Sequence, residues 1–179
     1  MKIYLVRHGE TDLNKQNRMQ SISDEPLNEK GIAQAQAAKQ KIGDMHFDAI
    51  YSSSLIRAIT TASIIGGVDK SEIIIDDRII EADFGKYEKK KYYFIGLPMI
   101  LHWCLPEVFP PRKTVETVDH IKARANSFLE DLKTKDYDSV LIVCHGNFIR
   151  FFKHILLKDS KQATWKDFVE NCELQEFEI

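Results

Sequence analysis

The order of hydrophobic patterns along the 179-residue chain predicts an α/β fold. Short apolar runs, typical of buried strands, alternate with longer segments whose apolar residues recur at helical spacing. This alternation favours three layers, in which a mainly parallel central sheet carries helices on both faces. The chain is also long enough to bury one core without disulfides or metals. We therefore predict a single domain over residues 1–179, interrupted at about 86–113.

The predicted strands are short apolar runs, and they comprise 2–6, 47–53, 72–76, 139–144 and, as an edge strand at most, 173–179. The predicted helices comprise 28–42, 55–65, 114–133 and 147–157. Asn28 is the expected N-cap of the first helix, and Gly43 its expected end. Ligands of such folds bind at the carboxyl ends of parallel strands, where both His8 and His145 fall.

Residues 86–113 break the alternation. Lysines at 86, 89, 90 and 91 precede an aromatic stretch that proline and glycine interrupt. We expect a lid over the active site or, alternatively, a contact between two copies in a homodimer. The uncharged part, 92–106, is shorter than the roughly 20 apolar residues that a membrane span needs.

Composition restricts the class of partner and the compartment. The chain has 25 Lys and Arg against 27 Asp and Glu, so no overall positive charge recommends nucleic acid or an anionic membrane. Cys104, Cys144 and Cys172 are odd in number and lack paired metal-ligand spacing, which argues against a disulfide framework or a zinc site. The N-terminal apolar run is too short for a signal peptide. We therefore expect a cytoplasmic protein.

Five residues could together process a phosphomonoester, which is a dianion. Its cleavage needs positive donors, a nucleophile and an acid for the leaving oxygen. Taken singly, each candidate also has an ordinary structural explanation. The candidates are Arg7, His8, Arg57, His145 and, as the acid, Glu81.

The run Arg7-His8-Gly9-Glu10-Thr11 resembles the signature of the histidine phosphatase superfamily, which includes cofactor-dependent phosphoglycerate mutases. Further matches follow in the family's order, which makes the resemblance specific. They are Asn14; Pro26, Leu27, Gly31, Gln34 and Ala35; the 53–58 segment with Arg57; the 80–85 segment with Glu81; and Cys144-His145-Gly146 followed by Arg150.

This resemblance implies a role for each site residue. His8 is the nucleophile that forms a phosphohistidine, while Glu81 protonates the leaving alkoxide and then activates water. The groups that hold the phosphoryl oxygens are Arg7, Asn14, Arg57 and His145, and the candidate substrate contacts are Thr11, Gln20 and Ser21. No metal ion or cofactor takes part.

The leading hypothesis is therefore a metal-independent phosphatase of small phosphorylated metabolites. A phosphoglycerate mutase would use the same intermediate, but the insertion at 86–113 is modest for a site that must shield it from water. A catalytically silent phosphate-binding protein is a further alternative. A cysteine mechanism is also conceivable, because Cys144 and Arg150 stand in C-x5-R spacing. The sequence leaves the substrate open among phosphosugars, phosphorylated ribazole, phosphoserine and phosphoprotein.

Overall fold

A five-stranded sheet forms the centre of the computed structural model, which describes residues 1–159 and 163–179. The strand order is β3-β2-β4-β1-β5, with β5 antiparallel to β1 and the other pairs parallel. The strands are β1 (Lys2–Arg7), β2 (Ala49–Ser52), β3 (Ile74–Ile75), β4 (Ser139–Cys144) and β5 (Leu174–Glu178). The prediction of a mainly parallel sheet with one edge strand in the C-terminal segment is confirmed.

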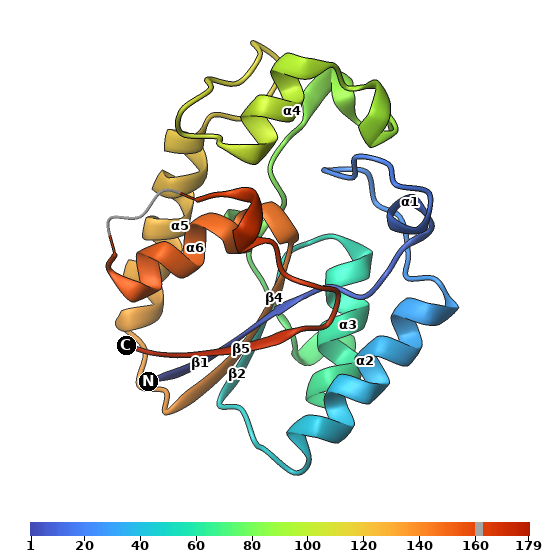
Figure 1. Ribbon diagram of the computed structural model, residues 1–179. Coiled ribbons are helices and arrows are strands. Elements are labelled where there is room, and N and C mark those ends of the chain that lie inside the picture. Colours follow the sequence, from blue (N-terminus) through green and yellow to red (C-terminus); the bar gives the residue numbers. More distant parts are fainter. Residues whose placement is uncertain (160–162) are drawn as a thin grey trace.

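Helices cover both faces of this sheet (Figure 1). One face carries α2 (Glu29–Ile42) and α3 (Ile56–Gly66), and the other carries α5 (Val118–Lys133) and α6 (Gly146–Leu157). The short α1 (Asp12–Lys15) follows β1. The expected three-layer α/β architecture is therefore confirmed.

Alternation along the central strands produces two separate cores. In β1, Ile3 and Leu5 pack with the residues of α5 and α6, whereas Tyr4 and Val6 pack with those of α2 and α3. All four side chains are buried. Successive side chains of a strand point to opposite faces, so a strand that is apolar throughout must lie between two helical layers.

Local signals define the start and end of α2 as predicted. The Asn28 side chain accepts a hydrogen bond from the Gly31 amide at 2.8 Å, and the helix ends at Gly43, whose φ is 66°. A positive φ is costly for residues that have a Cβ atom, so glycine suits this position.

Several predicted elements are shorter in the structure, among them one helix and one strand. The helix expected from residue 114 begins at Val118, because Thr117 provides the N-cap and Glu116 pairs through its backbone amide with the Asp83 carbonyl. The strand expected over 72–76 is reduced to β3, because 3-10 turns at Lys70–Glu72 and Asp77–Ile79 flank it. Both differences reflect contacts with distant or flanking segments that local hydrophobicity does not encode.

The segment 86–113 lies beyond the carboxyl ends of the parallel strands, where α4 (Leu97–Cys104) caps the molecule (Figure 1). Two 3-10 turns precede α4, at Gly85–Tyr87 and Tyr92–Phe94, and another such turn is Trp165–Asp167.

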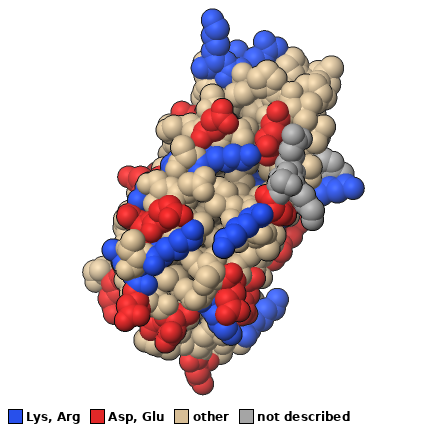
Figure 2. Space-filling model, turned by 90° about the vertical axis from the view of Figure 1, so that its left-hand side faces the viewer, with Lys and Arg blue, Asp and Glu red and all other residues tan. Residues whose placement is uncertain are grey.

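No helix within 1–159 or 163–179 is long and apolar enough to cross a membrane. Acidic and basic side chains are interspersed over the side formed by α5 and α6 (Figure 2).

Two glycines allow the loop after β1 to contact the first turn of α2. A Cβ atom on Gly9 would lie 2.5 Å from the Gly31 carbonyl oxygen, and one on Gly31 would overlap the Glu10 backbone. This contact fixes the loop that carries the first residues of the candidate site.

We expect Gly31→Ala to lower the free energy of unfolding by about 1–3 kcal/mol, because the added methyl group overlaps backbone. Helix propensity alone predicts the opposite, a gain of about 1 kcal/mol. Urea denaturation measures the difference, and Ala33→Gly in the exposed part of the same helix is the control. A Gly31→Ala protein as stable as the wild type would contradict the role assigned to this contact.

Candidate active site

Two neighbouring parallel strands bring the two histidines together. Arg7 of β1 pairs in register with Cys144 of β4, and the His8 amide continues the pairing by donating to the Cys144 carbonyl at 3.0 Å. The centroids of the His8 and His145 rings lie 5.0 Å apart. Residues 137 positions apart in the sequence therefore face one site at the carboxyl ends of the strands.

His8 has the protonation state of a nucleophile. Its Nδ1 lies 2.7 Å from the Gly9 carbonyl oxygen, and because a carbonyl can only accept, Nδ1 carries the hydrogen. Burial lowers the pKa of His8 well below its usual value, and the charges of Arg57 and Arg7 lower it further. The ring is therefore neutral near pH 7, with an unprotonated Nε2.

The C-terminal segment fixes the backbone on which His8 sits. The Asn171 side-chain amide donates to the His8 carbonyl at 2.7 Å, and the Cys172 amide donates to the Arg7 carbonyl at 2.9 Å. Sequence reasoning missed Asn171, because an isolated asparagine far along the chain has no pattern that relates it to residue 8.

Arg7 and Arg57 are buried cations that backbone carbonyls hold in place. Arg7 donates through Nη1 to the Val169 carbonyl at 2.8 Å. Arg57 donates through Nη2 and Nη1 to the carbonyls of Ser21 and Ser23, at 2.6 and 2.7 Å. Burial lowers the pKa of Arg57 to about 10, so it remains charged at pH 7. Neither guanidinium forms an ion pair within 1–159 and 163–179.

Four buried nitrogen atoms around these residues lack a partner in the described part of the chain. They are Arg7 Nε, Gln20 Nε2, Arg57 Nε and His145 Nδ1. The Ser53 hydroxyl lies 2.6 Å from His145 Nε2, and when it donates there, Nδ1 carries the ring hydrogen. Buried donors are normally satisfied. Of these residues, Arg7 and Gln20 line the small polar cavity beside His8, where an anion with several acceptor oxygens would find donors.

Glu81 is a buried carboxyl group whose ionised form is disfavoured. It is 5% exposed, and burial raises its pKa even though it accepts hydrogen bonds from three backbone amides. Those amides belong to Ala82 at 2.8 Å and to Asn147 and Phe148, both at 3.2 Å, in the first turn of α6. The carboxyl group is therefore fixed against the same helix that follows His145.

A half-buried ion pair positions the loop that carries Glu81. Glu116 accepts from Arg124 Nε at 2.9 Å and from the Asp83 amide at 3.1 Å. Arg124 Nη1 also donates to the Ile80 carbonyl at 2.7 Å. The residues on both sides of Glu81 are thus tied to the start of α5.

The remaining predicted contacts lie in the loop between β1 and α2. Asn14 and Gln20 line the small polar cavity beside His8, whereas Thr11 and Ser21 are fully buried behind it. Thr11 Oγ1 donates to Gln20 Oε1 at 2.7 Å, which directs the Gln20 amide nitrogen elsewhere. Ser21 Oγ accepts from the Phe84 amide at 3.1 Å. Thr11 and Ser21 therefore hold Gln20 and Phe84, which line the cavity, in place.

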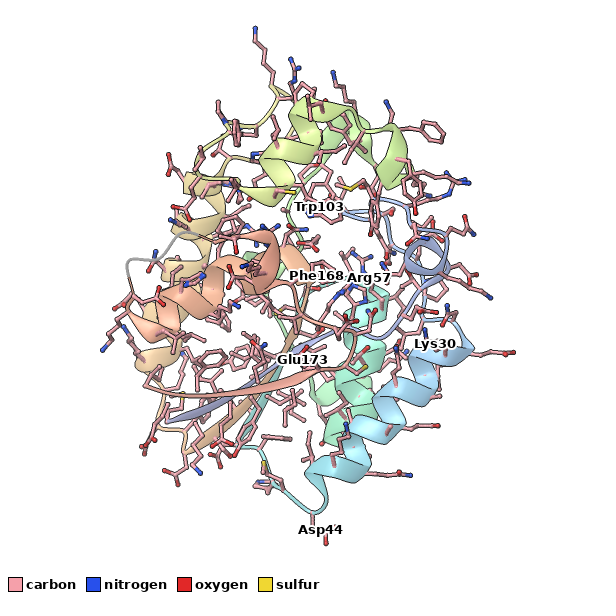
Figure 3. The ribbon with its side chains drawn as sticks, viewed as in Figure 1. Lys30, Asp44, Arg57, Trp103, Phe168 and Glu173 are labelled. Carbon is pink, nitrogen blue, oxygen red and sulfur yellow. The ribbon has the colours of Figure 1, made fainter. Side chains whose placement is uncertain are left out.

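The polar cavity, of about 20 Å³, adjoins a larger one of about 550 Å³. Tyr92, Trp103 and Phe168 line both. Figure 3 shows Trp103 and Phe168 between α4 and the ends of the strands, near Arg57. The segment expected to act as a lid thus contributes Tyr92 and Trp103 to the site.

The cysteine alternative lacks a thiolate. Cys144 is fully buried, and burial raises the pKa of its thiol far above neutrality. The Arg150 guanidinium donates to the carbonyls of Trp103 and Thr164 and to the Asn147 side chain. Within 1–159 and 163–179, no group of three or more His, Cys, Asp or Glu side chains is arranged to hold a metal ion.

Comparison with known proteins is consistent with this geometry. Residues 3–179 match the family model of the histidine phosphatase superfamily (branch 1). Phosphoserine phosphatase 1 of Hydrogenobacter thermophilus is 31% identical over 96% of this chain and 83% of its own. A mutant phosphoserine phosphatase of Entamoeba histolytica, solved in complex with phosphoserine, is 27% identical with a TM-score of 0.82, over 98% of this chain and 89% of its own. A protein named probable phosphoglycerate mutase GpmB, of Proteus mirabilis, is 38% identical over 51% of this chain and 42% of its own.

Burial of neutral histidines makes stability depend on pH. The lowered pKa values of His8 and His145 mean that below about pH 6.5 the unfolded chain binds protons that the native protein does not. The contribution of the two neutral histidines to the free energy of unfolding is therefore complete above about pH 6.5 and is lost as the pH falls. The raised pKa of Glu81 acts in the opposite sense, because its neutral form stabilises the fold at low pH and this contribution is lost as the pH rises through the native pKa.

We expect the change in unfolding free energy between pH 7.5 and pH 5.5 to be about 1 kcal/mol smaller in His8→Asn than in the wild type. Glu81 is present in both proteins, so its effect cancels. Urea denaturation at the two pH values measures the change, with His46→Asn as the control at an exposed histidine. Identical pH dependence in His8→Asn and the wild type would show that His8 is not held neutral.

Proposed function

Because the chain belongs to the histidine phosphatase superfamily, we propose that it hydrolyses small phosphorylated metabolites through a phosphohistidine on His8. The observation that carries this proposal is the set of unpartnered buried nitrogen donors around a neutral His8 ring. A phosphoryl dianion satisfies those donors, balances the two guanidinium charges and presents its phosphorus to Nε2.

In the first half-reaction, His8 Nε2 forms a bond to phosphorus as the bond to the leaving oxygen breaks. Glu81, whose pKa burial raises, acts as the general acid and gives its proton to that oxygen. The positive charge that develops on the imidazole ring is stabilised by the Gly9 carbonyl oxygen, 2.7 Å from Nδ1. Arg7 and Arg57 hold the charge on the phosphoryl oxygens.

In the second half-reaction, the Glu81 carboxylate takes a proton from water while the water oxygen attacks phosphorus. The phosphorus–nitrogen bond breaks, and His8 returns to its neutral state with inorganic phosphate as the product. Asn14, Gln20 and His145 would hold the oxygens of the transferred group in both steps. The cationic side chains supply the charge stabilisation, so the proposed mechanism needs no metal ion.

Hydrolysis is preferred over mutase chemistry because of the extent of the matches. Similarity to the phosphoserine phosphatase covers 96% of the chain, whereas similarity to the GpmB protein covers 51%. Interconversion of 2-phosphoglycerate and 3-phosphoglycerate by the wild-type protein, faster than phosphate release, would instead establish a mutase.

We expect His8→Ala to lower phosphate release from p-nitrophenyl phosphate by on the order of 10⁴-fold or more, because no nucleophile remains. Cys144→Ser should retain activity, since the thiol takes no part, and excess EDTA should leave the wild type active. Brief incubation with substrate should also produce an acid-labile phosphoprotein that His8→Ala lacks.

Other outcomes identify the alternatives. Loss of activity in Cys144→Ser with retention in His8→Ala would establish a thiolate mechanism. Binding of inorganic phosphate by the wild type, without phosphate release from any phosphomonoester or formation of a phosphoenzyme, would indicate a silent binding protein.

We expect Glu81→Gln to lower kcat/KM by about 10²–10⁴-fold for an alkyl phosphate, whose alkoxide must be protonated as it leaves. The loss should be less than about tenfold for 2,4-dinitrophenyl phosphate, whose leaving group departs as a stable anion. Asp77→Asn, which changes an exposed carboxylate in the 3-10 turn before Glu81, is the control. Equal losses for both substrates in Glu81→Gln would remove Glu81 from the role of acid.

A further inference from the structure

The larger cavity beside the site has an aromatic wall. It measures about 550 Å³, and the residues it shares with the polar cavity are Tyr92, Trp103 and Phe168. A substrate whose phosphoryl group lies beside His8 can therefore extend along these rings into the larger cavity. A cavity of this size is in the range that holds a whole organic ligand.

Contacts among the rings define how this wall is built. The Tyr92 and Trp103 ring centroids lie 4.8 Å apart with planes inclined at 47°. The Phe168 ring stacks on the Arg7 guanidinium, with 4.5 Å from Cζ to the ring centroid. The wall therefore extends outward from Arg7. Trp103 comes from α4, whereas Phe168 comes from the segment before β5 (Figure 3).

The buried charge beside this cavity is already satisfied. Arg150 lines the cavity, but its guanidinium donates to the Trp103 carbonyl at 2.8 Å, the Thr164 carbonyl at 3.2 Å and the Asn147 side chain at 2.9 Å. Arg150 therefore links α6 to Trp103 and Thr164, and few of its N–H groups remain free to bind a ligand. In contrast, the buried Trp103 Nε1 has no partner in the described part of the chain.

We propose that the alcohol part of the substrate is a flat, apolar ring system that packs against Tyr92, Trp103 and Phe168 while the phosphoryl group lies beside His8. This inference rests on the proposed phosphatase activity. A ring acceptor atom near Trp103 would satisfy the indole nitrogen. The exposed Lys166 and Glu170 also line the cavity, but phosphoserine is small and would leave most of the aromatic wall uncovered.

The test compares phosphate release from 2-phenylethyl phosphate and ethyl phosphate, which both have primary alkoxides as leaving groups. We expect kcat/KM to be at least about tenfold higher for 2-phenylethyl phosphate, and also higher than for phosphoserine. Trp103→Leu should reduce the ratio of the two kcat/KM values to about threefold or less, whereas Trp103→Phe should keep most of it.

Phe94→Leu is the matched control, because Phe94 is an aromatic residue of the same segment but is 77% exposed. It should leave the ratio at its wild-type value. Equal kcat/KM values for the two alkyl phosphates, or a preference for phosphoserine, would overturn the inference while the phosphatase proposal stands. Absence of phosphate release from every substrate, p-nitrophenyl phosphate included, would overturn the phosphatase proposal itself.

Discussion

Two buried guanidinium groups without a carboxylate partner are the constraint on which the site depends. Arg7 and Arg57 are held by backbone carbonyls of Val169, Ser21 and Ser23, which orient the groups without neutralising them. Unpaired charge is costly to bury. The sheet, the loop after β1 and the C-terminal segment must therefore be stable enough to offset this cost. In the proposed mechanism, the phosphoryl anion of the substrate balances the two charges.

The same burial shifts the pKa values of the two groups to which the proposed mechanism assigns nucleophilic attack and proton transfer. It lowers the pKa of His8 and raises that of Glu81, because a charged form is disfavoured in either case. The same environment thus disfavours the charged form of both side chains. Hydrogen bonds from backbone amides, including that of Asn147 in α6, oppose the rise in the pKa of Glu81.

Much of this arrangement could be predicted from local sequence patterns. The apolar runs of β1 and β4 end at His8 and His145, and parallel strands place their carboxyl ends at one edge. Asn28 and Gly43 likewise carry their own signals for the ends of α2. Residues such as an N-capping asparagine or a helix-ending glycine act through their immediate neighbours, so the sequence alone is sufficient to predict these structures.

The parts that escaped prediction depend on contacts between distant segments. Every residue has a backbone carbonyl, so the identity of Val169 does not indicate that its carbonyl accepts a hydrogen bond from Arg7. The sequence around Arg7 does not indicate this partner either. The displaced start of α5 has the same origin, because pairing with Asp83 overrides helix propensity at residue 116. The aromatic cavity also arises only when the lid segment meets the C-terminal loop.

The contacts on the His8 backbone link two segments that the ribosome makes far apart in time. Proteins are synthesised from the N-terminus at a limited rate, so residue 8 is made long before Asn171 and the carbonyl of Val169. β5 then adds to the edge of the sheet beside β1. During synthesis the His8 backbone is therefore present without the groups that orient it, and the candidate site is completed only after residues 169–172 have been made.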